Sequence, residues 1–285
     1  MGSHRESWAR SVSLVVLLAC ALGCSSVLST FTPAPTTPPG SVRGAAALGV
    51  NVPVGDLTDL ADQGDAIAEK SLAGGTLTRA EQDELVESAL ALSLDPPSAT
   101  GELQGRYGVA EAFDVGVRIA SAVTARIDGR WQFLKSQEQG AFAGSVGLGL
   151  AYYARTFEIP NADIEQIVGV AELTRFELDV PLLFGWSGDI GHVWFGPKVV
   201  ANTYTADVEL AFFQTEVAQG SASGTSFFWG GLVGGAVGYK YPWLAFELTI
   251  LDLSSSASVE SSVYNADLSF GGIVLYPALG VIIQI

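Results

Sequence analysis

The chain has little charge, and it lacks long apolar runs beyond its first residues. Charged residues make up 15% of its 285 residues, whereas soluble domains carry about a quarter. The mean hydropathy is nevertheless +0.35. Because no run of 18 apolar residues follows residue 25, the sequence excludes a protein that spans a membrane with helices. High hydropathy without such a helix is typical of strands that alternate apolar and polar residues.

Cysteine, histidine and basic clusters are scarce as well. Both cysteines lie in the first 24 residues, so the remainder offers no disulfide, thiol nucleophile or cysteine metal site. His192 is the one histidine after His4, and a lone histidine favours a hydrogen-bonding role over a catalytic one. We therefore expect no enzyme, catalytic residue, metal or cofactor. The net charge of −16 and the lack of basic runs argue against nucleic-acid binding.

Alternation is the strongest positive signal. Residues 113–119 place an apolar side chain at every second position, with Asp114, Gly116 and Arg118 between them. The pattern recurs at 127–133 and 176–182. Since alternate side chains of a strand lie on opposite faces, the chain forms sheets with one apolar and one polar face. In a soluble sandwich the apolar faces meet each other, whereas in an outer-membrane barrel they meet lipid.

The connections between the expected strands favour the barrel. The pattern predicts all-β structure with strands at 44–54, 102–109, 112–121, 123–134, 141–155, 171–184, 192–206, 226–239, 242–251 and 271–285. Short links between them alternate with longer ones at 55–101, 156–170, 207–225 and 252–270, apart from a tight turn near Ala122. Transmembrane barrels have short periplasmic turns and longer external loops. This alternation places both chain ends on the periplasmic side.

Aromatic residues gather near the expected strand ends. Interfaces between membrane and water favour such rings, whereas a soluble sandwich concentrates them in mid-strand. One set belongs to the periplasmic rim (Tyr107, Phe113, Trp131, Phe133, Phe184, Trp186, Tyr239, Tyr241 and Trp243). The other belongs to the opposite rim (Tyr152, Tyr153, Tyr204, Phe227, Phe228 and Trp229).

Two segments resemble bacterial outer-membrane β-barrel proteins of the porin-like superfamily. Residues 280–285 are similar to their C-terminal strand, although this chain ends in Ile285 where that group has Phe or Tyr, and 106–116 resemble a barrel hairpin. The resemblance implies a closed antiparallel up-and-down transmembrane β-barrel of about 10 strands (range 8–12) over 44–285. It also implies a cell-envelope location in the bacterial outer membrane, with lipid as a partner.

The first 24 residues resemble a lipoprotein signal peptide. A short basic region precedes the apolar stretch 12–22, and Gly23 stands directly before Cys24. The resemblance implies lipidation (palmitate) of Cys24 and an N-terminal lipid anchor, with Cys20 as the alternative site. Ordinary cleavage after Ala21 is the other possibility. Residues 25–43 are rich in Ser, Thr and Pro, and we expect them to form an extended tether that buries no core.

Placing the apolar side of each strand outward leaves charged residues facing the lumen. Six are basic (Arg106, Arg118, Arg126, Arg130, Arg175 and Lys198) and six are acidic (Glu102, Asp114, Asp128, Glu177, Asp179 and Glu247). Eight strands are just filled by side chains, and open aqueous channels need about 16. We therefore expect a lumen filled by a network of paired charges. A narrow conduit is the second possibility, and a catalytic role for the pairs is the third.

The longest connection predicts a helical insertion at 56–98. Thr78 and Glu81 form a capping box, and the helix that follows ends at 95–97. A second helix is expected over 57–72. Its aspartates recur every third residue without the order of a calcium loop, so they predict a solvated acidic face. Ten acids at 55–101 oppose Lys70 and Arg79.

The sequence thus divides into a signal peptide (1–24), a tether (25–43) and a barrel (44–285). It favours a non-enzymatic outer-membrane barrel lipoprotein with a filled lumen. Acidic external loops are available to contact envelope or surface proteins, giving a structural or surface-interaction role. The alternatives are a narrow channel or carrier for small solutes, and a secreted sandwich tethered by lipid.

Overall fold

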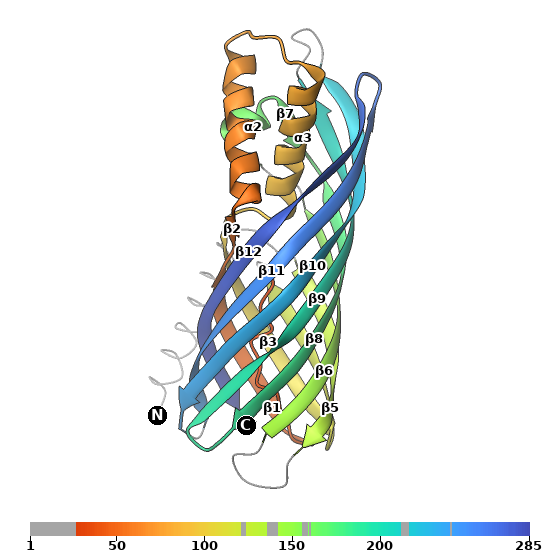
Figure 1. Ribbon diagram of the computed structural model, residues 1–285. Helices are drawn as coiled ribbons and strands as arrows, with labels where there is room; N and C mark the ends of the chain where they lie inside the picture. Colours follow the sequence, from red (N-terminus) through yellow and green to blue (C-terminus); the bar gives the residue numbers. More distant parts are fainter. Residues whose placement is uncertain are drawn as a thin grey trace, which may run out of the picture.

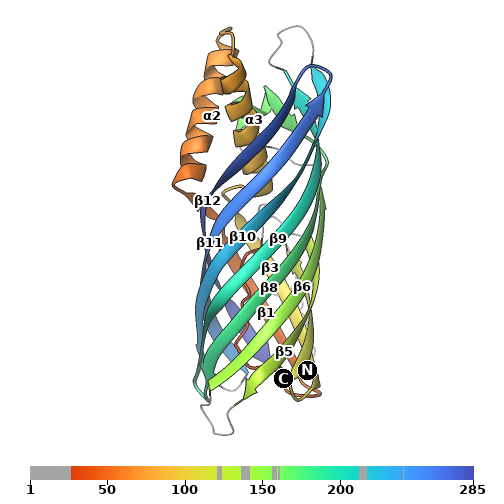
Figure 2. The same ribbon diagram turned by 45° about the vertical axis from the view of Figure 1, so that its right-hand side comes forward.

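Ten strands close into a ring in the computed structural model, which describes residues 27–120, 124–135, 142–155, 159, 161–211, 217–239 and 241–285. Each strand of the ring pairs with its neighbours in an antiparallel manner. The ring consists of β1 (Val42–Val50), β3 (Ala99–Ala110), β4 (Phe113–Ala120), β5 (Thr124–Lys135), β6 (Phe142–Arg155), β8 (Leu173–Ser187), β9 (Gly191–Leu210), β10 (Ala218–Gly238), β11 (Pro242–Ser261) and β12 (Asn265–Gln284). Figures 1 and 2 show it as a tall, tilted cylinder.

The first and last strands close the ring. β1 pairs with β12 from Arg43 opposite Gln284 to Gly49 opposite Ala278. Two short strands, β2 (Val52–Val54) and β7 (Val168–Val170), extend the sheet by pairing with β12 and β9. The predicted fold, a closed antiparallel up-and-down barrel of about 10 strands, is confirmed.

Four strands are much longer than the others. β9 to β12 contain 20 or 21 residues each, whereas β4 contains 8 and β5 contains 12. Figure 1 shows these strands rising above the rest of the ring, beside the helices. The predicted long loops at 207–225 and 252–270 are therefore wrong, because most of those residues continue the strands.

The two faces of these long strands exchange polarity partway along. On β11 the outward side chains change from apolar (Leu244, Phe246, Leu248 and Ile250) to polar (Asp252, Ser254, Ser256, Ser258 and Glu260). The inward side chains change in the opposite sense, from Glu247 and Thr249 to buried Leu251, Leu253, Ala257 and Val259. The upper parts of the strands therefore cover an apolar core, and the lower parts enclose a polar lumen.

Most of the expected rim aromatics face outward, and four do not. Tyr107, Trp131, Trp186 and Tyr241 are exposed at the lower rim. The exceptions are buried inside the barrel (Tyr153, Tyr204, Phe228 and Trp243). Placing them at the outer rims was wrong, because each occupies the inward parity of its strand.

Three helices lie at the upper end: α2 (Asp56–Leu72), α3 (Arg79–Leu94) and the short α4 (Ala162–Glu165). The capping box is present, since Glu81 N–H donates to the Thr78 hydroxyl and the Glu81 carboxylate accepts from Thr78 N–H. α3 buries Leu85, Val86 and Leu90 in one hydrophobic core with the upper parts of the long strands. None of the helices in the described part of the chain is long and apolar enough to span a membrane.

Residues 27–37 lie inside the barrel. Leu28, Phe31, Ala34 and Thr37 are each at most 1% exposed. The expectation that 25–43 forms a tether without buried residues is therefore wrong for the described residues. From 38 to 40 the chain is exposed at the lower rim, and it then turns upward into β1. The lower end also holds Ile285, whose N–H and carbonyl bond to Val42.

Candidate functional site: the barrel lumen

The structure places all twelve predicted lumen charges on the inner face of the wall. Eleven of the residues are buried, with Asp114, Asp179, Lys198 and Glu247 fully so. Asp128, the twelfth, has a side chain that is 7% exposed. Such groups persist away from water only when partners compensate their lost hydration. Each buried charge in the lumen therefore needs a partner, and the pairs form two clusters.

A lower cluster is centred on Asp114, near the start of β4. Its two carboxylate oxygens receive Arg106 and Arg130 at 2.7 Å each. Arg106 also contacts Asp128. Two guanidinium groups thus share one carboxylate, and the second acid offsets part of the excess positive charge.

A middle cluster is centred on Asp179 of β8. Arg126 and Lys198 both pair with its carboxylate, and the Lys198 Nζ lies 3.0 Å from Oδ2. On the adjacent strands β4 and β3, Arg118, the register partner of Arg126, lies 3.2 Å from Glu102. Gly149 makes room for this arrangement, because a Cβ there would lie 2.5 Å from Arg126 Nε. A side chain at position 149 would therefore displace the Arg126 guanidinium from its present place.

Arg175 and Glu177 lie above these two clusters on β8. The Arg175 guanidinium donates to the Leu94 carbonyl at 3.0 Å and lies 5.2 Å from the centre of the Tyr153 ring. Asn51 donates to the carbonyls of Asp95 and Pro96. The C-terminal end of α3 is therefore bonded to the wall at the barrel mouth, which closes the lumen from above.

Residues 27–37 occupy the lower lumen and bond to these charges through the main chain. Lys198 donates to the Leu28 carbonyl at 2.7 Å, and Arg118 donates to the carbonyls of Ser29 and Thr30 at 2.7 and 2.6 Å. Further down, three other carbonyls accept from Arg130, Ser145 and Arg43 (Pro33, Ala34 and Pro35). We call residues 27–37 the lumen segment.

The amides of the lumen segment are bonded as well. Glu247 accepts from Thr30 N–H at 2.5 Å and from Phe31 N–H at 2.8 Å. Nearer the lower rim, Gln132 accepts from Thr36 N–H at 2.9 Å and Asp114 accepts from Thr37 N–H at 2.7 Å. The wall thus supplies donors and acceptors in register with an extended backbone.

Phe31 adopts a conformation that aromatic residues rarely adopt. Its φ is +46°, in the left-handed region. The neighbouring atoms hold it there, because Glu247 accepts its N–H and Gln104 donates to its carbonyl at 2.5 Å. Such backbone strain persists where surrounding contacts fix the conformation, and it is often found at functional sites.

The sequence offered little sign of this occupant or of four of its partners. Arg43, Gln104, Gln132 and Ser145 also face the lumen segment. Arg43 adds a seventh cation to the lumen, so the six-to-six balance was incomplete. A usable signal was the composition of the segment itself, since prolines lack N–H groups and leave carbonyls in need of donors.

The upper end is held to the barrel by one face of α3. Arg79, Asp83 and Glu87 lie along this face and contact the edge of β12 and the turn before it. Asp83 accepts from the Tyr264 hydroxyl at 2.7 Å, and Glu87 accepts from Ser269 N–H at 3.2 Å. Arg79 pairs with Asp83 at 3.1 Å, and its Cζ lies 4.1 Å from the centre of the Tyr264 ring. The helix thus covers a strand edge that would otherwise be open to pairing.

Burial shifts the pKa values of the ionisable side chains at this contact. Loss of hydration raises the pKa of Glu87, and the Ser269 amide opposes that rise. Burial, followed by the hydrogen bond to Asp83, raises the pKa of Tyr264. Exposed Glu81 differs, because its hydrogen bonds to Lys70 and to Thr78 lower its pKa from 4.5 to about 2.

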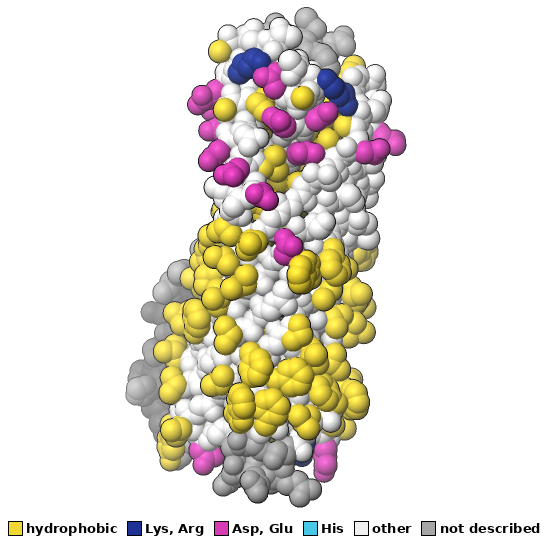
Figure 3. Space-filling view, viewed as in Figure 1, with side chains coloured by type: hydrophobic (Ala, Val, Ile, Leu, Met, Phe, Trp, Pro, Cys, Tyr) yellow, Lys and Arg dark blue, Asp and Glu magenta, His cyan; other side chains and the backbone are white. Residues whose placement is uncertain are grey.

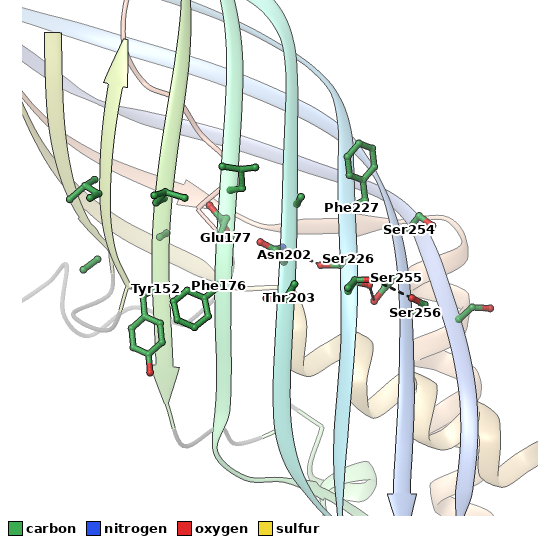
Figure 4. Close-up of a pocket in the computed structure, with 18 residues that line it drawn as sticks. Tyr152, Phe176, Glu177, Asn202, Thr203, Ser226, Phe227, Ser254, Ser255 and Ser256 are labelled. Carbon is green, nitrogen blue, oxygen red and sulfur yellow. Dashed lines mark hydrogen bonds between the residues drawn. The ribbon is translucent and has the colours of Figure 1, made fainter.

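A groove of about 1020 Å³ lies on the outer wall where the outward face changes from apolar to polar. Figure 4 shows Tyr152 and Phe176 side by side at one end and Phe227 towards the other. The Tyr152 and Phe176 ring centroids are 4.9 Å apart. The short side chain of Thr203 on β9 lies between Phe176 and Phe227, and Ser254 and Ser256 on β11 lie beyond Phe227. The groove results from small residues among larger ones, and it is outside the lumen.

No family model matches the chain, and the curated proteins include no match. Among solved structures, the chain is similar to Ail, the attachment invasion locus protein of Yersinia pestis, at 11% identity and a TM-score of 0.30, covering 87% of this chain and 99% of that one. It is also similar to the outer membrane protease OmpT from Escherichia coli at 9% identity and a TM-score of 0.39, covering 90% and 99%. At these values the likeness carries no functional argument, and the strand pairing establishes the barrel.

The predicted signal peptide with Cys20 and Cys24 lies outside the described residues. His192 is half-buried at the lower rim, and its ring centroid lies 4.3 Å from that of Trp243. Within the described part of the chain, no group of three or more His, Cys, Asp or Glu side chains is arranged to hold a metal ion.

Proposed function

We propose that the chain is a non-enzymatic outer-membrane β-barrel lipoprotein whose lumen is closed by its own lumen segment. Its acidic upper end contacts other molecules outside the cell, so the role is structural or one of surface interaction. The observation that carries the proposal is the lumen segment, whose carbonyls and amides are bonded to buried charges from several strands.

The outward face of the barrel supports a membrane location. On β9, β10 and β12 the outward apolar stretches span 193–201, 227–237 and 273–283, which are 9, 11 and 11 residues. A transmembrane strand needs about 9–11 residues. Figure 3 shows hydrophobic side chains over the lower part of the visible face and acidic ones above them.

The connections support an orientation with the helices outside the cell. The lower end carries short turns, such as 111–112 and 188–190, together with Ile285. The upper end carries α2, α3 and the extended parts of the long strands. Outer-membrane barrels keep short turns in the periplasm and larger connections outside. The C-terminus is then periplasmic.

The acidic upper end supports a role in contacting other molecules. Four aspartates of α2 (Asp56, Asp59, Asp62 and Asp65) lie on the same end as outward Asp207, Glu209, Glu260 and Asp267. The basic residues of the helical hairpin are Lys70 and Arg79. A surface whose charges share one sign attracts partners of the opposite charge, and salt screens that attraction. We expect a basic protein surface to be the partner, with binding that weakens as ionic strength rises.

Lipid attachment at Cys24 belongs to the same proposal, and the lumen segment constrains it. Three residues span at most about 11 Å of chain, and Val27 is already buried in the lumen. A lipid on Cys24 in the periplasmic leaflet and residues 27–37 inside the barrel are therefore alternative states of the same chain. The closed lumen proposed above is the state in which residues 27–37 are inside the barrel.

Conductance across a planar bilayer tests the closed lumen. We expect the purified full-length chain to insert without stable unitary currents. Stable currents from the intact chain would contradict the closed barrel and favour a narrow solute channel. Heat-modifiable gel migration of the same sample verifies that the barrel is folded, so that an absence of current cannot be caused by misfolded protein.

A further inference from the structure

The lumen segment is recognised through its backbone. Among the described residues, wall side chains donate hydrogen bonds to the carbonyls at seven of the eight positions from 28 to 35 (Leu28, Ser29, Thr30, Phe31, Pro33, Ala34 and Pro35). Four amides donate to wall side chains (Thr30, Phe31, Thr36 and Thr37). Every amino acid carries a backbone carbonyl, and all but proline carry the amide. The wall therefore makes most of its bonds to groups that other peptide sequences also possess.

Side chains of the segment add few polar contacts. Ser29 Oγ donates to Glu102 at 2.5 Å, and Thr36 Oγ1 donates to Gln132 at 2.9 Å. Thr30 Oγ1 lies 3.5 Å from Lys198, which is a weak contact. The segment thus resembles a bound peptide that is held by main-chain bonds and limited by side-chain size.

The segment is also separate from the wall in topology. It contributes no strand to the ring, and the isolated bridge recorded for the described residues joins Pro39, which follows the segment, to Gly108 at the lower rim. Its link to β1 passes through exposed residues 38–40. The contacts that hold it inside the barrel are therefore noncovalent side-chain contacts.

The space that the segment fills has one open end. Above it, the inward side chains become apolar and pack with α3, as with Phe228, Leu251 and Leu253. The bonds of Arg175 and Asn51 to the end of α3 close the mouth. Removing the segment would therefore leave a pocket open at the lower rim, and not a conduit through the barrel.

We propose that the lower lumen is a peptide-binding site, in which residues 27–37 are an exchangeable occupant and an extended segment of another protein can take their place from the lower rim. The chemistry of the wall defines the ligand. Arg43, Arg118, Arg130 and Lys198 require an unbroken row of carbonyls, which a Pro- and Thr-rich extended peptide supplies. Because the side chains of Leu28, Phe31 and Ala34 are fully buried, the ligand must carry apolar side chains of similar or smaller size at these three positions. In the outer-membrane orientation, such a ligand enters from the periplasm.

The test uses the full chain with a protease site inserted at 38–41 and both native cysteines changed to serine. After cleavage in detergent, a fluorescent peptide of residues 27–39 is added, and anisotropy follows its uptake. A second peptide keeps Leu28, Phe31, Pro33, Ala34 and Pro35 in place and has the remaining residues in shuffled order. We expect both peptides to enter the barrel with affinities within about tenfold of each other.

Wall variants show whether uptake occurs in the lumen. Lys198→Met removes the donor to Leu28, and we expect it to weaken both peptides at least tenfold. Ser223→Ala, on the outward upper part of β10, is the matched control and leaves uptake unchanged. Entry of the native peptide alone would overturn exchange with other proteins. If neither peptide binds, or if Lys198→Met leaves the affinity of both peptides unchanged, the lower lumen is not a peptide-binding site.

A second variant keeps the test decisive if cleavage unfolds the barrel. Residues 27–37 are replaced by an alternating Lys/Ser sequence of equal length, which the buried cations Arg118, Arg130 and Lys198 repel from the lumen and which leaves the turn at 38–41 intact. Heat-modifiable migration selects the folded sample, to which the same two peptides are added. Uptake of both supports the proposal, and a folded barrel that binds neither refutes it. The result of this peptide-binding test does not depend on the conductance measurement, which tests the closed lumen of the proposed function.

Discussion

Removing the carboxylate of Glu247 is expected to destabilise the barrel strongly. Glu247 is fully buried and accepts three short hydrogen bonds, from Thr30 N–H at 2.5 Å, Phe31 N–H at 2.8 Å and Trp194 Nε1–H at 2.7 Å, and a longer one from the Thr249 hydroxyl at 3.4 Å. An unsatisfied buried donor costs about 1–3 kcal/mol, so Glu247→Ala should lower the free energy of unfolding by roughly 3–9 kcal/mol. Water entering the space left would move the loss towards the lower value.

A graded series isolates the hydrogen bonds. Glu247→Gln keeps the shape and one acceptor oxygen, so we expect a loss between those of Glu247→Ala and a control. Glu260→Gln, on the exposed upper part of β11, is that control and should stay within about 0.5 kcal/mol of the parent. Urea titration in detergent micelles, followed by tryptophan fluorescence and gel migration, measures all three. A loss below about 1 kcal/mol for Glu247→Ala would refute the reasoning.

Three further predictions concern the membrane belt, the helical hairpin and the lipid. Val233→Arg on the apolar part of β10 should lower the free energy of unfolding in lipid by about 2–4 kcal/mol, whereas Ser223→Arg on the upper part of the same strand should lower it by about 0–1 kcal/mol. Equal losses for the two variants in a vesicle-folding titration would contradict a membrane boundary between these two positions. The lowered pKa of Glu81, about 2, contributes stability above pH 4.5 that is lost as pH falls towards 2. The protection factor of the Glu81 amide, which is the intrinsic exchange rate at each pH divided by the observed rate, should therefore fall between pH 5 and 2.5 in the parent but not in Glu81→Gln, and an unchanged protection factor in the parent would contradict the capping assignment. Cys24→Ser should abolish labelling by radioactive palmitate, and persistent labelling would point to Cys20.

The barrel and its lumen charges could be predicted because alternation is a local signal. Asp114 and Arg118 alternate with apolar neighbours, and the strand geometry alone places the two sets on opposite faces. Which acid pairs with which base could not be predicted in this way. That Arg106 and Arg130 share Asp114 depends on the register of three strands.

The length of the last four strands was missed for a different reason. Their alternation continues through 251–259, but the apolar residues move from the outward face to the inward face. A search for outward apolar residues therefore ended at Ile250 and treated the Ser-rich remainder as a loop. The interior changes from charged side chains to the apolar face of α3, and the proposed membrane location adds a change from lipid to water outside; together these account for the exchange.

The lumen segment was missed because composition was taken as a sufficient guide to burial. A run rich in Pro, Ser and Thr cannot form an apolar core, and this led to the expected tether. Inside a charged lumen the requirement is the reverse, since Arg118, Arg130 and Lys198 need acceptors. The carbonyls of an extended chain provide them.

Thiol accessibility tests the lumen segment most directly. In a chain whose native cysteines are serine, single cysteines are introduced at Ala34, which is fully buried, and at Pro39, which is exposed at the lower rim. A membrane-impermeant maleimide is then added to the folded protein in detergent. We predict that the cysteine at 39 reacts rapidly and the cysteine at 34 reacts only after unfolding. Equal rapid labelling at both positions would contradict a lumen closed by residues 27–37.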